Sequence, residues 1–196
     1  MKNINFLLAG VGGQGTLLAS DVLAEVGMRA GADVKKSEVH GMSQRGGAVT
    51  SHVRWGDLVA SPLCEAGTVD YYLAQEKLEA LRWIEFLAPT GTVMLSDQSL
   101  PPTSTVFGDD QYPDDERVLS MLRQAAGQVW RVPASQIAER LGNPRVANSV
   151  LLGALSAALD VPEEDWLAII AGHVPQKHFE VNRQAFLAGR QGDWAA

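Results

Sequence analysis

A polar loop between two apolar segments carries the side chains of this chain that are best suited to bind or transfer a charged group. In the stretch SEVHGMSQRGGAV, His40 can carry a proton and Arg45 can grip an anion with a planar fork of N–H groups. The neighbouring serine and glutamine offer hydrogen bonds, and the two glycines let the backbone approach a bound group closely. The candidate residues of this loop are His40, Ser43, Gln44, Arg45, Gly46 and Gly47.

Composition leaves a second interpretation of the loop open, namely a solvated turn whose arginine makes a surface ion pair. A nucleophilic triad is not indicated, because Ser43 lacks a strand-to-helix elbow and no acid is placed to orient His40. His52 is predicted to be a histidine of a sheet, whereas His173 and His178 lie far from any second cluster of ligand types. We therefore expect no metal bound by this chain alone.

A glycine turn near the N-terminus is the second candidate site. The stretch GVGGQG has glycines at Gly10, Gly12 and Gly15, spaced as G-x-G-x-x-G, after an apolar run and before a helical pattern. In that context the glycines permit a tight turn, close approach of a phosphate to the backbone, and packing of the helix on the strand. The candidate residues of this turn are Gly12, Gly13, Gln14 and Gly15.

The acidic residue that completes a nicotinamide site is misplaced in this sequence. Such sites hold the ribose with an acid about 20 residues further on, at the tip of the second strand. Here Asp33 starts that strand, and Glu38 lies near its tip just before the glycine-rich loop. The pattern is therefore not evidence for NAD, and a glycine turn that serves only packing is as well supported as one that binds phosphate.

Hydrophobic spacing predicts an α/β chain with a Rossmann-like, three-layer, mostly parallel sheet and a helical layer or arm at the C-terminus. Predicted strands cover residues 3–10, 32–39, 47–56, 68–76, 91–97 and 127–133. Predicted helices cover 16–31, 77–89 and 116–126, and then 134–143, 145–160, 162–174 and 176–190. Two helical faces are expected to be buried, and they consist of Leu17, Leu18, Val22 and Val26, and of Leu78, Leu81, Ile84 and Leu87. We treat residues 1–196 as one domain, with 134–196 as its helical C-terminal part.

Composition excludes several classes of function. The 196 residues carry 16 Lys and Arg against 23 Asp and Glu, a net charge of −7 without a basic run, so nucleic acid is not an expected partner. Cys64 is the only cysteine, which rules out an internal disulfide and an iron–sulfur cluster held by this chain alone. Without a signal-peptide pattern or a long apolar run, the expected location is cytoplasmic, with no membrane contact.

Several motifs in order along the chain resemble one enzyme family. GVGGQG, EVHGMSQRGG running into SHVR, SPL, LEALR, LGNPRVANSVLLGALS and VPQKHFEVNRQAF are similar to the gamma subunit or domain of the 2-oxoacid:ferredoxin oxidoreductases. HGMSQRGG favours the branch that contains the beta subunit of indolepyruvate:ferredoxin oxidoreductase. The pyruvate, 2-oxoisovalerate and 2-oxoglutarate branches stay open as alternatives.

The resemblance implies an accessory subunit of a complex that oxidatively decarboxylates an aryl 2-oxoacid to an acyl-CoA and reduces ferredoxin. Thiamine diphosphate, its magnesium (Mg) and the iron–sulfur clusters would then belong to a larger partner subunit. Coenzyme A could bind where the two subunits meet. The isolated chain is expected to be inactive, and a homodimer of the isolated chain is also open.

The resemblance also gives the polar loop a role. The glycine turn and residues 40–47 would form one face of a cleft, with Arg45 and the turn amides meeting a phosphate of coenzyme A or the substrate carboxylate. Asn143, Arg145 and Asn148 would help to close this site, although Asn143 with the following proline equally fits a helix cap. Two other functions remain: a free nucleotide-binding oxidoreductase and a non-enzymatic assembly module.

Overall fold

The computed structural model describes residues 3–40, 47–102 and 111–194. Its strands are β1 (Ile4–Val11), β2 (Asp33–His40), β3 (Ala48–Gly56), β4 (Val69–Ala74), β5 (Leu87–Ser96) and β6 (Gln128–Val132). Its helices are α1 (Thr16–Arg29), α2 (Lys77–Arg82), α4 (Asp115–Ala125), α5 (Ala134–Arg140), α6 (Ala147–Ala157), α7 (Glu163–His173) and α8 (Gln176–Gln191). Short 3-10 turns are η1 (Ile84–Phe86) and η2 (Pro144–Val146). No helix in these ranges is long and apolar enough to cross a membrane.

The six strands form one sheet in the order β2-β3-β1-β4-β5-β6. Neighbours from β1 through β4 and β5 to β6 run parallel, whereas β3 is antiparallel to both β1 and β2. The predicted α/β class and mostly parallel sheet are therefore confirmed. The antiparallel β3 fits the length of the connection, because β2 ends at His40 and β3 begins at Ala48, whereas a parallel pair needs about a dozen connecting residues or more.

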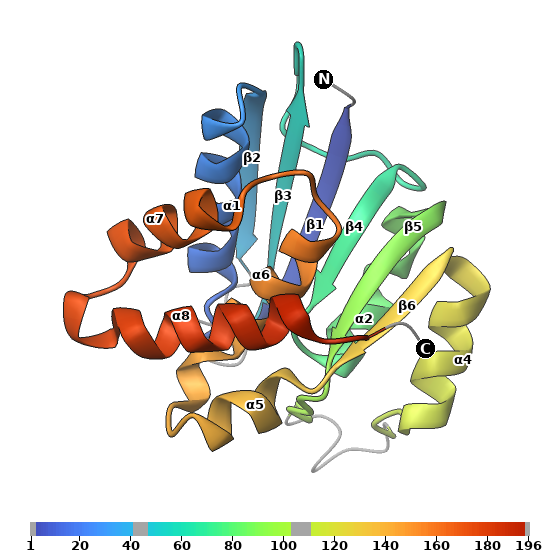
Figure 1. The fold of residues 1–196 in the computed structure, drawn as a ribbon. Coiled ribbons are helices and arrows are strands. Elements are labelled where there is room, and N and C mark those ends of the chain that lie inside the picture. The colour runs from blue at the N-terminus through green and yellow to red at the C-terminus, as the bar shows by residue number, and fades with distance from the viewer. Residues whose placement is uncertain (1–2, 41–46, 103–110, 195–196) are drawn as a thin grey trace.

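Helices cover the sheet on both faces, which gives three layers. One hydrophobic core joins Phe6 and Leu8 of β1 to α1, α6, α7 and α8, and the other joins Leu7 to α4 residues such as Val118 and Leu122. Figure 1 shows α7 and α8 as an outer row over α1 and α6, with which they are in contact. The expected C-terminal helical layer is confirmed. Alternate residues of β1 face opposite cores because successive side chains of a strand point to opposite sides.

Two predicted helical faces need correction. The helix expected over 77–89 ends at Arg82, and Leu87 instead begins β5, where it pairs with Val69 of β4. Pro89 disfavours helical backbone at Ala88, which lies in β5, but it is too far along the chain to account for the end of α2 at Arg82. In α1, Val22 and Val26 are buried as expected, but Leu17 is 37% exposed.

Two glycines allow α6 and α8 to pack closely. A Cβ at Gly153 of α6 would lie 2.0 Å from the carbonyl oxygen of Phe186, and a Cβ at Gly189 of α8 would lie 1.9 Å from that of Val150. Each helix therefore needs a residue without a side chain where it meets the backbone of the other. This contact holds the outer helical layer against the sheet.

We expect Gly153→Ala to lower the free energy of unfolding by about 3 kcal/mol, because the new methyl group forces the two helices apart. Gly172 of α7 provides a matched control, since nothing lies within 4 Å of the Cβ position there. Gly172→Ala should raise the free energy of unfolding by about 0.5 kcal/mol through helix propensity. Urea unfolding of the variants measures both values, and equal effects would contradict the packing role of Gly153.

Candidate functional site

The glycine turn lies at the carboxyl end of β1 and leads into α1. Gly15 is the N-cap of α1 and has a φ of 80°, in the left-handed region that glycine adopts most easily. The N–H of Gly12 donates to the carbonyl of Gly47 at 2.9 Å, and Val11 pairs with Ala48. The second glycine-rich segment therefore meets the turn at Gly47, as the sequence predicted.

The rest of the predicted loop cannot be compared in the same way. Ser43, Gln44, Arg45 and Gly46, and the side chain of His40, lie outside the described part of the structure. The backbone of His40 ends β2 at the same edge of the sheet as the glycine turn, because it pairs with Val49 of β3.

The side chain of Gln14 folds back over the turn. Its Oε1 accepts a hydrogen bond from the N–H of Val11 at 2.6 Å. Its Nε2 donates to the carbonyl of Gln75 at 3.0 Å and to Oε1 of Gln98 at 2.8 Å. Since the backbone N–H groups of Gly12 and Gln14 are also bonded within the chain, three amides of the turn already have partners that a bound phosphate would have to replace.

The topology of the sheet around this turn also differs from that of a dinucleotide-binding site. In the Rossmann arrangement the strand beside the first is parallel to it and places the ribose-binding acid at its tip. Here that neighbour is β3, which runs antiparallel and ends at the opposite edge. Glu38 of β2 is one strand further away and is 2.6 Å from Lys36. The geometry therefore favours the packing interpretation of the glycine turn over NAD binding.

Further amides and a hydroxyl surround the turn. Asn148 at the start of α6 is 2% exposed, and its Nδ2 lies 3.4 Å from the carbonyl oxygen of Gly15. Gln75, at the end of β4, accepts a hydrogen bond from Thr16 through Oε1, while its buried Nε2 has no partner among the described residues. The structure thus brings Asn148 to the glycine turn, together with three polar residues that the sequence analysis missed, Thr16, Gln75 and Gln98.

A signal for two of the missed residues was present in the sequence. Gln75 is the next-to-last residue of the strand predicted over 68–76, and Gln98 directly follows the strand predicted over 91–97. Parallel strands end at one edge of a sheet, so polar residues directly after them gather there.

The remaining predicted residues of the late motif have other roles. Asn143 is the N-cap of η2, where its side chain accepts a hydrogen bond from the backbone N–H of Arg145 at 3.2 Å. The capping alternative is therefore confirmed for Asn143. Arg145 itself is exposed.

A buried carboxylate stabilises the loop that follows β5. Glu76, which is 1% exposed, accepts hydrogen bonds from the N–H groups of Leu78 and Glu79 through Oε2. Its Oε1 accepts from the N–H of Leu100 at 3.1 Å and from the hydroxyl of Tyr112. Burial, and then the carboxylate of Glu76, raise the pKa of Tyr112, so this hydroxyl keeps its proton and donates. One side chain thus attaches both ends of the β5–α4 connection to α2.

The single cysteine does not fit an iron–sulfur or nucleophilic role. Burial raises the pKa of the Cys64 thiol to about 11, so the thiolate is not populated at neutral pH. The backbone N–H of Cys64 donates to Nδ1 of His52, whose pKa burial lowers. The part of the chain that the structure describes contains no group of three or more His, Cys, Asp or Glu side chains able to hold a metal ion.

The fold and the site together define a class: a Rossmann-like α/β chain whose glycine turn is filled by its own glutamine. Residues 5–192 match the family model described as pyruvate ferredoxin/flavodoxin oxidoreductase. The chain belongs to this family.

Three relatives are subunits of 2-oxoacid oxidoreductases or synthases by name. The chain is 40% identical over 159 residues to indolepyruvate oxidoreductase subunit IorB of Archaeoglobus fulgidus, covering 81% of this chain and 79% of that protein. It is 38% identical to the subunit of the same name from Thermococcus kodakarensis, over 96% and 95% of the two chains. A 2-oxoglutarate synthase subunit KorC from Methanothermobacter marburgensis is 30% identical over 94% and 93%.

Two solved structures share the fold. The gamma subunit of a keto/oxoacid ferredoxin oxidoreductase from Geobacter sulfurreducens superposes with a TM-score of 0.70 at 24% identity, over 96% of both chains. The pyruvate oxidoreductase subunit PORC of Thermotoga maritima has a TM-score of 0.72 at 22% identity, over 100% of this chain and 98% of that one. The predicted Rossmann-like fold of a gamma-type subunit is therefore confirmed.

We expect Gly15→Ala to destabilise the protein more than Gly13→Ala. Both glycines have positive φ, so alanine strains the backbone at either position by about 1–2 kcal/mol. Only at Gly15 would the new Cβ also lie 2.6 Å from Nδ2 of Asn148, whereas nothing lies within 4 Å at Gly13. Thermal unfolding of the two variants measures the difference. Asn148→Ala should remove most of the excess in the double variant, and no such rescue would show that Asn148 does not pack on the turn.

We expect Glu76→Ala to lower the free energy of unfolding by about 3 kcal/mol, since it leaves one buried and two partly buried N–H groups without an acceptor. Asp114→Ala is the matched control, because Asp114 caps α4 with a single exposed hydrogen bond to the N–H of Arg117. That variant should cost about 1 kcal/mol. Hydrogen exchange provides a second measurement, in which the amide of Leu100 exchanges faster only in Glu76→Ala. Unchanged exchange at Leu100 would contradict the attachment.

Proposed function

We propose that this chain is the accessory subunit of an indolepyruvate:ferredoxin oxidoreductase, which oxidatively decarboxylates an aryl 2-oxoacid to an acyl-CoA. One observation carries the choice of substrate. Relatives named as indolepyruvate oxidoreductase subunits are 33–40% identical to this chain, whereas relatives named as 2-oxoglutarate synthase subunits are 28–30% identical. The pyruvate, 2-oxoisovalerate and 2-oxoglutarate branches are the alternatives that the substrate test distinguishes.

The metal-binding side chains that this chain offers support the assignment of the cofactors to another subunit. An iron–sulfur cluster needs several thiolates, and the only cysteine is buried with a raised pKa. Thiamine diphosphate needs a metal held by oxygen ligands, for which the described residues offer no acidic cluster. Thiamine diphosphate, its magnesium and the clusters therefore belong, in this proposal, to a larger partner subunit in the cytoplasm, and ferredoxin takes electrons from the assembled complex.

Within this proposal, the edge of the sheet that carries the glycine turn faces the partner. The side chain of Gln14 already accepts a hydrogen bond from the N–H of Val11, and the carbonyl of Gly47 accepts one from the N–H of Gly12. Recognition of an anion thus falls mainly to the loop that follows β2, with Arg45 as the cationic group, and less to the turn amides. The anion is a phosphate of coenzyme A or the carboxylate of the 2-oxoacid. His40, Ser43 and Gln44 are the further polar residues of that loop.

Co-expression with the large thiamine-dependent subunit from the same genome tests the proposal. The two chains should elute together in size-exclusion chromatography, and only the complex should reduce a viologen dye when both indolepyruvate and coenzyme A are present. Pyruvate and 2-oxoglutarate should react more slowly. Turnover by the isolated chain with NAD or a flavin, or a failure of the two chains to associate, would overturn the proposal.

The Arg45→Gln variant tests whether Arg45 binds the anion or has only a structural role. We expect the complex with Arg45→Gln to form normally but to lose about tenfold or more in kcat/KM, because a charge-assisted hydrogen bond is worth about 1.5–3 kcal/mol. Arg123→Gln, at an exposed position in the last turn of α4, makes the same change of charge and should keep full activity. Equal activity of the two variants would exclude Arg45 from the site.

A further inference from the structure

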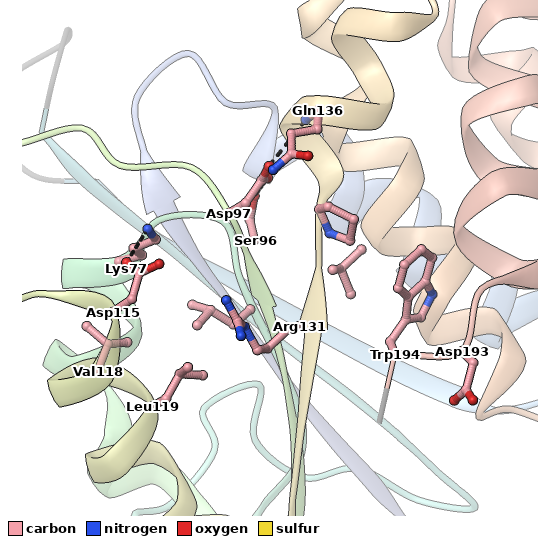
Figure 2. Close-up of a pocket in the computed structure, with 13 residues that line it drawn as sticks. Lys77, Ser96, Asp97, Asp115, Val118, Leu119, Arg131, Gln136, Asp193 and Trp194 are labelled. Atoms are coloured by element: carbon pink, nitrogen blue, oxygen red, sulfur yellow. Dashed lines mark hydrogen bonds and ion pairs between the residues drawn. The ribbon is translucent and has the colours of Figure 1, made fainter. Parts of the chain in front are cut away.

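A cavity at the edge of the sheet where β1 and β4 begin differs in its charges from the cavity beside β5 and β6. In the latter, which has a volume of about 380 Å³, Figure 2 shows Lys77 beside Asp115, with which it forms an ion pair. The former has a volume of about 320 Å³, also within the range of small-molecule sites, which begins at about 300 Å³. Among the described residues, two aspartates and no basic side chain line it.

The two carboxylates of this cavity have few partners. Asp70, at the start of β4, accepts one hydrogen bond, from the backbone N–H of Asn5 at 2.8 Å. The carboxylate of Asp160, which follows α6, has no ion pair or hydrogen bond within the described ranges. Two arginines that contact neighbouring residues are engaged elsewhere, since Nε of Arg54 donates to Oδ1 of Asn5 at 2.9 Å and Arg190 is paired with a glutamate of α7. The chain therefore leaves the negative charge of the cavity uncompensated.

The hydroxyl of Thr92 is a second, independent feature that points to a ligand. Thr92 lies in β5, lines the cavity and is 8% exposed, yet its hydroxyl has no hydrogen-bond partner in the part of the chain that the structure describes. A buried polar group without a partner costs stability, so such groups normally meet a water molecule or a ligand. A hydrogen-bond donor bound in the cavity would satisfy this oxygen.

The ring of Tyr71 forms an aromatic wall beside these polar groups. Its register partners on the neighbouring strands are Phe6 of β1 and Thr92 of β5. Phe6 stacks on the ring with centroids 5.7 Å apart, so the other face of the ring lies on the side of β5. The hydroxyl of Tyr71 donates to the carbonyl of Ala158 at 3.2 Å, which holds the ring in place. The remaining walls are aliphatic and come from Ile4, Ala158 and Leu159.

We propose that this cavity binds a primary alkylammonium ion, the protonated form of a small aliphatic amine. An ammonium group has three N–H donors and no acceptor, which suits the carboxylates of Asp70 and Asp160 and the hydroxyl of Thr92. The positive charge is also attracted by the face of the Tyr71 ring, and the alkyl chain packs on the aliphatic walls. The proposal concerns this chain alone and does not rest on the proposed oxidoreductase complex.

A metal ion fits the cavity less well than an ammonium ion. Calcium and magnesium take six or more ligands, which are mainly oxygen atoms. The described residues contain no group of three or more acidic, histidine or cysteine side chains able to hold a metal ion. Aliphatic and aromatic walls favour an organic cation instead.

Titration of the full-length, ¹⁵N-labelled chain with butylamine at pH 7 and constant ionic strength tests the site. Butylamine is protonated at this pH, as the lysine side chain is. We expect saturable shifts of the backbone amides of Tyr71, Thr92 and Leu159, with a dissociation constant in the millimolar range, about what so small a ligand allows. Butan-1-ol, which lacks the charge, and butyrate, which reverses it, should each bind at least about tenfold more weakly.

Two variants test the contacts of the ammonium group. Asp160→Asn should weaken butylamine binding about threefold, the size expected of an exposed ion pair, whereas Glu139→Gln, which removes the same charge at an exposed position of α5, should leave the affinity unchanged. Thr92→Val should weaken binding by about twofold to tenfold. It should also leave the melting temperature unchanged or higher, because no hydrogen bond within the chain is lost.

Several results would overturn the proposal. These are the absence of saturable shifts, equal binding of butan-1-ol, an unchanged affinity in Asp160→Asn or Thr92→Val, and a lower melting temperature of Thr92→Val, which would show that the hydroxyl has a partner within the chain. None of these outcomes depends on turnover by the complex, so the test stands apart from that of the proposed function.

Discussion

The amide side chain of Gln14 holds together the edge of the sheet on which the candidate site depends. Through one acceptor and one donor group it joins the turn after β1 to the ends of β4 and β5. Buried backbone groups must be hydrogen-bonded, and Gln14 satisfies the N–H of Val11 from within the chain. The turn is thus tied to the ends of the neighbouring strands by a side chain of its own, and the N–H of Val11 points to that side chain.

The antiparallel direction of β3 is the second feature that shapes the edge of the sheet at the glycine turn. It lies between β1 and β2, so the position from which a dinucleotide-binding strand would contact a ribose does not exist here. The same arrangement places both ends of the His40–Gly47 loop beside the turn, since β2 ends and β3 begins at that edge. The fold therefore lacks the ribose-binding strand of a dinucleotide site and has, at the same edge, the two ends of a polar loop.

The C-terminal helices matter for a different reason. The glycines of α6 and α8 let these two helices pack backbone to backbone. The first turn of α6 also places Asn148 on the glycine turn. After α8, the chain returns to the sheet, where Trp194 accepts a hydrogen bond from the backbone of Arg131 at the exposed side of β6. The C-terminal part thus contacts two separate regions of the sheet, the glycine turn after β1 and the strand β6.

The sequence by itself determined the α/β class, most helices and strands, and the meeting of the two glycine-rich segments, because periodicity and residue type encode these features. Asn143 as a cap was likewise readable from its neighbour Pro144. Only the tertiary structure decided the antiparallel β3, the early end of α2, the exposure of Leu17, and the gathering of Gln14, Gln75 and Gln98. Those features depend on contacts between residues far apart in the chain, such as the 84 positions that separate Gln14 from Gln98. The ends of the predicted strands indicate the edge at which Gln75 and Gln98 lie, but no local pattern specifies which side chain they contact.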